Sequence, residues 1–234
     1  MQQTGYLLYV KLETTAFNQY GIQYYQLSFL KNALRMMMEI NAAQSHLTEA
    51  DYLDGERDAE IRHELIGGKA YAMTGASDYH NKLSGNLFAE LRMALKRNNS
   101  PCSIYINDMK VKVNHNFYYP DVMVTGDRED IGNDYYKTHP IIIVEVLSPS
   151  TRRFDKTHKR QTYQSLESLQ AYVLIDQERA EIEMFTRQSG WQAEYFYPGD
   201  SIQFDGIDVV VAVEDIYYQV NNDDMQAFLQ TGQA

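Results

Sequence analysis

The most regular pattern along the chain is an apolar run over residues 140–147, PIIIVEVL, which one carboxylate interrupts at Glu145. β-Branched residues dominate the run and a Ser-Pro-Ser sequence follows it, so it predicts a strand buried on both faces. A second run, AYVLID over residues 171–176, predicts another buried strand. The segment between the two runs has helical spacing, and we expect a helix from about residue 155 to residue 167.

Other segments show helical or alternating spacing. Ser77 is suited to cap a helix that runs to about Arg97, with an apolar stripe on one side. Two short strands are expected within residues 62–74, joined at Gly67-Gly68, and two more around Ser189-Gly190. Further strands are expected over residues 103–106, 109–113, 118–124 and 208–213, with a short helix over 213–218. Strands and helices alternate, so we predict an α/β fold with a mixed β-sheet core flanked by helices and an additional β-hairpin.

The two ends of the chain have a different pattern from its middle. Residues 1–37 hold many Tyr and Gln without a clean period, and we expect an appendage there, or a start assigned too far upstream. A single domain is expected over residues 38–220, followed by a polar, frayed tail over 221–234. Near the start of that domain, Thr48 is suited to cap a helix over residues 49–53, and the acidic residues 54–60 are expected to form a loop.

Composition and charge narrow the function. The lone cysteine, Cys102, and the lack of a long apolar run or signal peptide favour a soluble, cytoplasmic protein with no membrane partner. The formal net charge of −11 counts against a tight, non-specific binder of nucleic acid. It does not exclude a nuclease, because a nuclease needs only a local basic path beside an acidic metal site.

Two carboxylates interrupt apolar strands. Glu145 either faces outward, pairs with a basic side chain or binds a metal, because an unpaired buried charge is costly. Asp121 lies in a second apolar segment, YYPDVMV, directly after Pro120. Pro120 is disfavoured in a central strand, so the segment is expected at an edge, a strand start or a bulge. The pair predicts a divalent-metal site, since a cation offsets the cost of gathering carboxylates.

A basic stretch, TRRFDKTHKR, follows the Glu145 strand. Lys159 shares a helical face with Tyr163 and Leu166, so it either snorkels or has an anionic partner. The other basic side chains form either a solvated helix start or a path for nucleic-acid phosphates; they are Arg152, Arg153, Lys156 and Arg160. The sequence contains no GxxxxGK[ST] phosphate loop, GxSxG elbow, HExxH helix or CxxC pair, which excludes the activities built on those motifs.

Three stretches together resemble the PD-(D/E)XK nuclease superfamily, and within it the Uma-type restriction-endonuclease family. They are HELIGGKAYAMTGASDYHNKLSGNLFAEL, YYPDVMV and IIIVEVLSPSTRRFDKTHKRQTYQSLESLQAYVLID. The resemblance covers roughly residues 46–220 and implies a restriction-endonuclease-like core. It also implies Mg²⁺-dependent, or Mn²⁺-dependent, cleavage of DNA phosphodiesters.

The resemblance assigns roles to residues of this chain. It implies that Asp121 and Glu145 hold the metal with the backbone carbonyl of Val146, and that Glu64 lies near the metal through water. The superfamily lysine is expected two residues after the glutamate, where this chain has Leu147. Uma-type members move that lysine to the following helix, and Lys159 matches the moved position. His80 matches a recurrent histidine, whose role is either functional or structural.

The sequence therefore predicts a metal-dependent endonuclease that hydrolyses DNA. Two alternatives stay open. One is a non-catalytic nucleic-acid-binding or regulatory protein on the same fold. The other is an interaction module whose Tyr-rich surface forms a homodimer or a larger complex. DNA binding without Mg²⁺-dependent cleavage would indicate the first, and a stable dimer without DNA binding would indicate the second.

Overall fold

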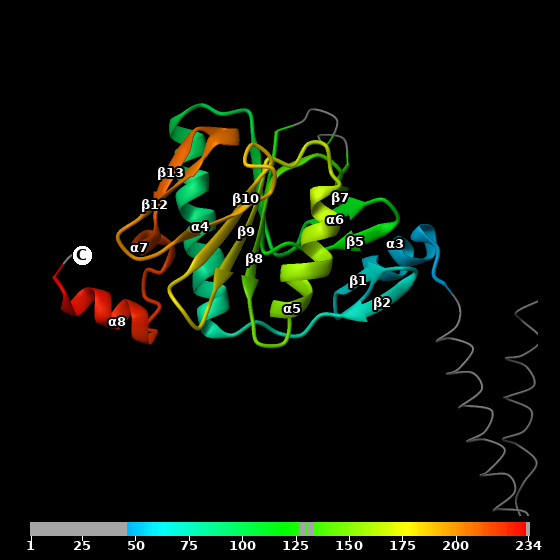
Figure 1. Ribbon diagram of the computed structural model, residues 1–234. Helices are drawn as coiled ribbons and strands as arrows, with labels where there is room; N and C mark the ends of the chain where they lie inside the picture. Colours follow the sequence, from blue (N-terminus) through cyan, green and yellow to red (C-terminus); the bar gives the residue numbers. More distant parts are fainter. Residues whose placement is uncertain (1–45, 127–129, 131–132, 233–234) are drawn as a thin grey trace, which may run out of the picture. The chain divides into compact units, whose positions relative to one another are not determined.

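A six-stranded sheet forms the centre of the structure, with β8 in its interior (Figure 1). The computed structural model describes residues 46–126, 130 and 133–232 of the chain. The strands are, in spatial order, β11 (Ala193–Phe196), β10 (Ile182–Thr186), β9 (Ala171–Asp176), β8 (Pro140–Leu147), β6 (Val122–Thr125) and β3 (Ser103–Ile106). β8 and β9 are parallel, and the other neighbours are antiparallel. The predicted buried strands over 140–147 and 171–176 are confirmed.

The side chains of β8 point alternately to two hydrophobic clusters. One cluster includes the apolar face of helix α4 (Asp78–Arg97) and the β8 residues Ile142, Val144 and Val146. The other includes Tyr163 of helix α6 (Arg160–Gln164) and the β8 residues Ile143 and Leu147. Because side chains alternate along a strand, Glu145 is directed to the same side as α6.

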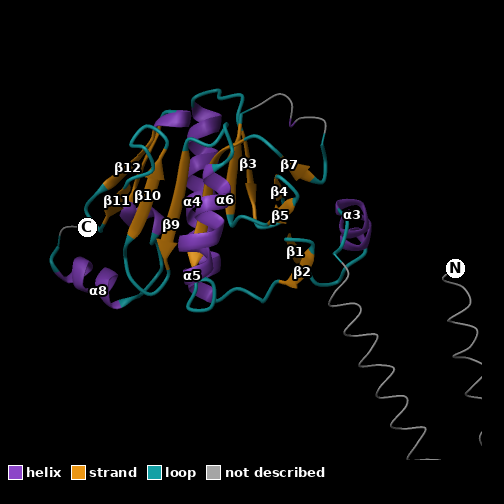
Figure 2. Ribbon diagram, turned by 45° about the vertical axis from the view of Figure 1, so that its right-hand side comes forward, coloured by secondary structure: helices purple, strands orange, loops and turns teal. Residues whose placement is uncertain are grey.

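A second sheet has five strands and lies beside α6 and helix α3, which spans Glu49–Arg57 (Figure 2). In spatial order they are β2 (Lys69–Ala72), β1 (His63–Ile66), β5 (Asn116–Tyr118), β4 (Lys110–Val113) and β7 (Tyr136–Lys137). β1 and β2 form the predicted hairpin, and Gly67 and Gly68 take the positive φ angles, 57° and 74°, that the turn requires. Helix α3 packs Tyr52 against Phe117 of this sheet.

Helices cover both faces of the six-stranded sheet, α4 on one and the segment after β8 on the other (Figure 1). That segment comprises α5 (Arg152–Phe154), the π-helical turn η2 (Asp155–Lys159) and α6. The C-terminal elements are β12 (Ser201–Phe204), the 3₁₀ turn η3 (Asp205–Ile207), β13 (Val209–Ala212), α7 (Val213–Ile216) and α8 (Asp223–Gln230). This arrangement confirms the predicted α/β fold. None of the described helices is long and apolar enough to span a membrane.

The predicted strand over residues 118–124 is wrong, because the chain changes sheets within it. β5 ends at Tyr118 in the five-stranded sheet, and β6 begins at Val122 in the six-stranded sheet. Pro120 lies between them, and its missing N–H cannot donate to a strand ladder. Asp121 therefore directly precedes a strand, which is one of the positions that Pro120 had indicated.

Several other elements also differ from the predictions. The expected loop over 54–60 is helical as far as Arg57, because the packing of Tyr52 and Leu53 on the sheet carries α3 further. The helix after β8 begins at Arg152 and ends at Gln164, and β12 was not predicted. The frayed tail is wrong for residues 223–230: Asn222 caps α8 by accepting the N–H of Met225, and Met225 is buried in the α4 cluster.

The domain limits stay a prediction at the N-terminal side. The predicted appendage over residues 1–37 and the predicted domain start at residue 38 lie outside the described residues. The compact unit that contains both sheets starts at Leu47.

Candidate active site

The β6–β8 pairing brings Asp121 and Glu145 to neighbouring positions. Val122 pairs with Val144, so one step outward along the antiparallel register Asp121 lies opposite Glu145. The backbone N–H of Val146 donates to Oδ2 of Asp121 at 2.7 Å, and the N–H of Asn107 donates to the carbonyl of Asp121 at 3.0 Å. These bonds hold the Asp121 carboxylate against the end of β8.

His80 fixes the other oxygen of Asp121. Its Nε2 lies 2.7 Å from Oδ1 of Asp121, and both side chains are mostly buried. His80 is in the first turn of α4, and Ser77 caps that turn by accepting the N–H of His80. The Ser77 hydroxyl also donates to Gln177, just after β9, at 2.6 Å. The sequence placed His80 on a family pattern alone, and the structure gives it a contact with a predicted metal ligand.

Lys159 lies among three carboxylates. Its ammonium is 3.0 Å from Oε1 of Glu64, 3.1 Å from Oε1 of Glu145 and 3.6 Å from Oδ1 of Asp155. The lysine is 6% exposed, so it does not snorkel to solvent and has anionic partners instead. Elements from both sheets meet here: β1 carries Glu64, β8 carries Glu145, and η2 carries Asp155 and Lys159.

Two further hydrogen bonds orient these carboxylates. The Tyr163 hydroxyl of α6 donates to Oε1 of Glu145 at 3.0 Å. The backbone N–H of Tyr119 donates to Oε1 of Glu64 at 3.1 Å. Lys159 and Tyr163 both donate to Oε1 of Glu145, which leaves Oε2 for another ligand.

Burial and charge act in opposite directions on the ionisable groups. Burial raises the pKa of Glu145 well above its usual value, and the attraction of Lys159 opposes that rise only in part. Burial raises the pKa of Asp155 in the same way. For Lys159, burial lowers the pKa, but Glu145, Glu64 and Asp155 together raise it well above the usual lysine range. Lys159 is therefore an ammonium group at neutral pH.

Four carboxyl groups of the site could supply oxygen ligands to a hard divalent cation that keeps part of its water shell. They belong to Asp121, Glu64, Glu145 and Asp155, and the last three surround the single ammonium of Lys159. Within the described residues, no group of three His, Cys, Asp or Glu side chains is arranged to hold a metal ion. Mg²⁺ does not require such a cage, since it is commonly bound through one or two carboxylates and several waters.

Most of the basic side chains of the predicted phosphate path contact other residues of the protein. Arg152 forms a bidentate pair with Asp176 and also reaches Glu178. Lys156 pairs with Glu183 at 2.7 Å, and the guanidinium carbon of Arg160 lies 4.7 Å from the centre of the Phe185 ring. Arg153 is exposed. The role of these four residues in DNA binding stays a prediction, and Arg153 is the one most open to a ligand.

Sequence reasoning missed Asp155 and Tyr163 as members of the site. Asp155 looked like a helix-start residue among basic neighbours, and Tyr163 looked like core. The signal for both was their spacing from Lys159: Asp155 is four residues before it and Tyr163 four residues after it. Residues at that spacing share a helical face, so a buried lysine there indicates buried polar neighbours.

Known proteins are similar to this chain in sequence. The model of a family described as "Uma2: Putative restriction endonuclease" matches residues 49–213. A Synechocystis protein, "Uncharacterized protein slr1290", is 31% identical over 73% of this chain and 91% of its own length. Another from Synechocystis, "Uncharacterized protein sll1609", is 35% identical over 60% of this chain and 80% of its own length.

A solved structure shows the same fold. It is the crystal structure of a "putative nuclease belonging to DUF820" from Anabaena variabilis. It aligns with a TM-score of 0.63 and 16% identity, covering 75% of this chain and 99% of that protein. The family model spans most of the described residues, including Glu64, Asp121, Glu145 and Lys159. The chain belongs to the Uma2 family of restriction-endonuclease-like proteins.

Proposed function

We propose that the protein is a Mg²⁺-dependent endonuclease that hydrolyses phosphodiester bonds in DNA. The observation that carries this proposal is the buried ammonium of Lys159 among Glu64, Glu145 and Asp155, beside the bound carboxylate of Asp121. The carboxyl groups of the site outnumber its one lysine, so a divalent cation would be attracted to it. The bound cation and the lysine would then attract an anionic substrate.

The metal would be held by Asp121 and Glu145, with the backbone carbonyl of Val146 as a further oxygen donor. When bound, Mg²⁺ lowers the pKa of a coordinated water and offsets charge on the phosphate. Mn²⁺ is expected to replace it, because oxygen ligands suit both ions.

Lys159 would act as a charged hydrogen-bond donor in this reaction. In the metal-free site, the charges of Glu145, Glu64 and Asp155 raise its pKa well above the usual range and favour the ammonium over the free amine that would remove a proton from water. An ammonium can instead orient the attacking water or stabilise negative charge that develops on the phosphate oxygens. Glu64 and Asp155 would hold that ammonium in place, and Tyr163 would keep Glu145 oriented toward it.

His80 would fix the rotamer of Asp121. Its contact with Oδ1 and the Val146 N–H on Oδ2 restrain both oxygens of that carboxylate. A carboxylate oxygen can accept more than one bond, so these contacts leave room for a metal. Restraint of this kind is typical of groups next to a metal ligand, which set its orientation.

A non-catalytic nucleic-acid-binding protein is the second candidate. Within the described residues, no three His, Cys, Asp or Glu side chains are arranged to hold a metal ion, which favours it over a metal-dependent enzyme. It predicts DNA binding that weakens with salt but no strand cleavage under any metal condition.

The test is a cleavage assay on supercoiled plasmid and on single-stranded DNA, with Mg²⁺, Mn²⁺ or EDTA. The proposal expects cleavage with either metal, none with EDTA, and none by Glu145→Gln. Cleavage that EDTA leaves unchanged would contradict the metal-dependent reaction. A DNA shift without cleavage would favour the second candidate.

A further inference from the structure

The helix that carries Lys159 contains one irregular turn. Over Asp155–Lys159 the backbone is π-helical, and the N–H of Arg160 reaches the carbonyl of Asp155, five residues back. π turns are rare and occur mostly as single turns inside α-helices, often at functional sites. This turn lies directly against the candidate active site.

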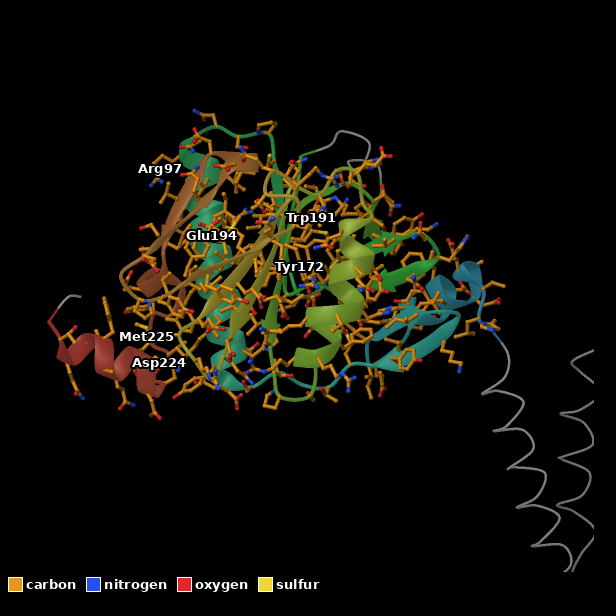
Figure 3. All side chains as sticks on the ribbon, in the orientation of Figure 1. Arg97, Tyr172, Trp191, Glu194, Asp224 and Met225 are labelled. Atoms are coloured by element: carbon orange, nitrogen blue, oxygen red, sulfur yellow. The ribbon has the colours of Figure 1, made fainter. Side chains whose placement is uncertain are left out.

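Two side-chain hydroxyls donate hydrogen bonds to backbone carbonyls, one in this turn and one next to it. The Tyr172 hydroxyl of β9 donates to the carbonyl of Asp155 at 3.0 Å, and the Thr157 hydroxyl donates to the carbonyl of Arg153 at 2.7 Å. Tyr172 of β9, labelled in Figure 3, is fully buried, so its hydroxyl needs an internal partner. A side chain that inserts into the backbone hydrogen-bond ladder of a helix is a known cause of local irregularity in the helix.

The π turn changes how the site residues line up along the helix. In a regular α-helix, residues four apart are offset by about 40°, and residues eight apart by about 80°. A π turn rotates less per residue, because each N–H reaches one residue further back. It therefore reduces the angular offset between Asp155 and Lys159, and Tyr163, one turn later, projects from the same side of the helix. All three side chains can then face Glu145.

We propose that Tyr172 is a positioning residue for Lys159. Its hydroxyl holds the π turn open through the Asp155 carbonyl, and the turn places Asp155 and Lys159 together beside Glu145. The inference rests on the proposed function for its effect on cleavage, but its effect on the turn can be measured without cleavage.

Tyr172→Phe tests this role by removing one hydroxyl. The Tyr172 ring packs at 5.4 Å from the Tyr163 ring and 6.4 Å from the Phe185 ring, contacts that phenylalanine keeps. In the variant, the Asp155 carbonyl loses its tyrosine donor and the turn is expected to relax toward α-helix. Tyr217→Phe is the matched control, because Tyr217 is also fully buried and its hydroxyl donates to backbone carbonyls, including that of Asp176.

Two structural readouts come first. Amide hydrogen exchange at Arg160 should become measurably different in Tyr172→Phe, and the ¹⁵N NMR signal of the Lys159 ammonium should shift. Neither should change in Tyr217→Phe. An unchanged Lys159 signal and unchanged exchange in Tyr172→Phe would overturn the inference. If Tyr172→Phe does not fold, a wild-type crystal structure decides, because a regular α-helix over residues 152–164 would overturn it as well.

Kinetics then separate this inference from the proposed function. Tyr172→Phe should lower kcat by roughly ten- to a hundred-fold with KM nearly unchanged, the cost of a small misplacement of a catalytic group. Tyr217→Phe should keep the wild-type kcat. If the wild type does not cleave DNA, the proposed function fails while the NMR and exchange results still test the positioning role. If Tyr172→Phe keeps the wild-type kcat, the positioning role fails while the proposed function stands.

Discussion

The Lys159 ammonium lies 3.1 Å from Oε1 of Glu145, although the lysine comes from a helix fourteen residues further along the chain. The superfamily pattern expects this lysine two residues after the glutamate, where Leu147 is buried in the hydrophobic cluster around Tyr163. A charge at that position would replace a packed apolar side chain. The segment after β8 supplies the ammonium instead, from its π-helical turn.

Lys159→Met should abolish most cleavage. The expected loss is about two to three orders of magnitude in rate, the usual cost of removing a group that stabilises developing charge. Mn²⁺ binding should persist, because removing the ammonium leaves the carboxylates more negative. Plasmid cleavage and calorimetry measure both effects, with the exposed Lys69→Met of β2 as the control. Wild-type cleavage by Lys159→Met would remove the lysine from the mechanism.

Glu145→Gln should abolish Mn²⁺ binding while the fold stays intact. The amide keeps the shape of the side chain and still accepts the Tyr163 hydroxyl, but it lacks the charge that attracts a cation. Calorimetric titration with Mn²⁺ checks the first effect, and a thermal melt checks the second. Glu183→Gln is a matched control, since Glu183 is a buried strand glutamate paired with another lysine, Lys156. Equal Mn²⁺ affinity in Glu145→Gln and wild type would contradict the site.

The ion pair between Arg152 and Asp176 should contribute stability that is lost in acid. Burial raises the pKa of Asp176, but the hydrogen bonds and charge of Arg152, together with the backbone N–H groups of Glu178 and Arg179, outweigh it and lower the pKa from 3.8. A carboxyl whose pKa is lower when folded stabilises above its unfolded pKa, and that stability is lost as pH falls through the folded pKa. Arg152→Met should therefore cost about 1–3 kcal/mol at neutral pH.

Urea unfolding of wild type and Arg152→Met, from neutral pH to below the usual aspartate range, measures this effect. The difference between the two proteins should shrink as the pH falls below 3.8, where Asp176 becomes protonated in both. A difference that stays constant over that range would show that Arg152 stabilises the protein by packing rather than by its charge.

Changes at the two ends of the chain should affect stability differently. Deleting residues 1–35 should shift the melting temperature by only a few degrees, because that stretch has no sequence pattern that ties it to the core. Phe228→Ala in α8 should destabilise the protein by about 3 kcal/mol, since Phe228 is buried in the α4 cluster. Thermal and urea unfolding test both. A chain that does not fold without residues 1–35 would contradict the first, and an unchanged Phe228→Ala would contradict the second.

Much of the fold was readable from local patterns. The β-branched run over 140–147 and the capped helix after Ser77 were predicted with their bounds, because backbone propensity, capping and apolar spacing act within a few residues. The paired carboxylates Asp121 and Glu145 were readable for the same reason: a charge inside an apolar run is a local anomaly. The family pattern then singled out Lys159.

Tertiary structure decided the rest. The change of sheet at Pro120, the continuation of α3 and the helix α8 depend on partners far away in the sequence, which no local spacing encodes. So does the pairing of Arg152 and Lys156, two of the four residues of the predicted phosphate path, with acidic side chains on other elements. The π turn is the clearest case. Its residues have ordinary helical spacing, and the turn became visible only where the buried hydroxyl of Tyr172 meets the carbonyl of Asp155, because a buried hydroxyl must find a hydrogen-bond partner in the fold around it.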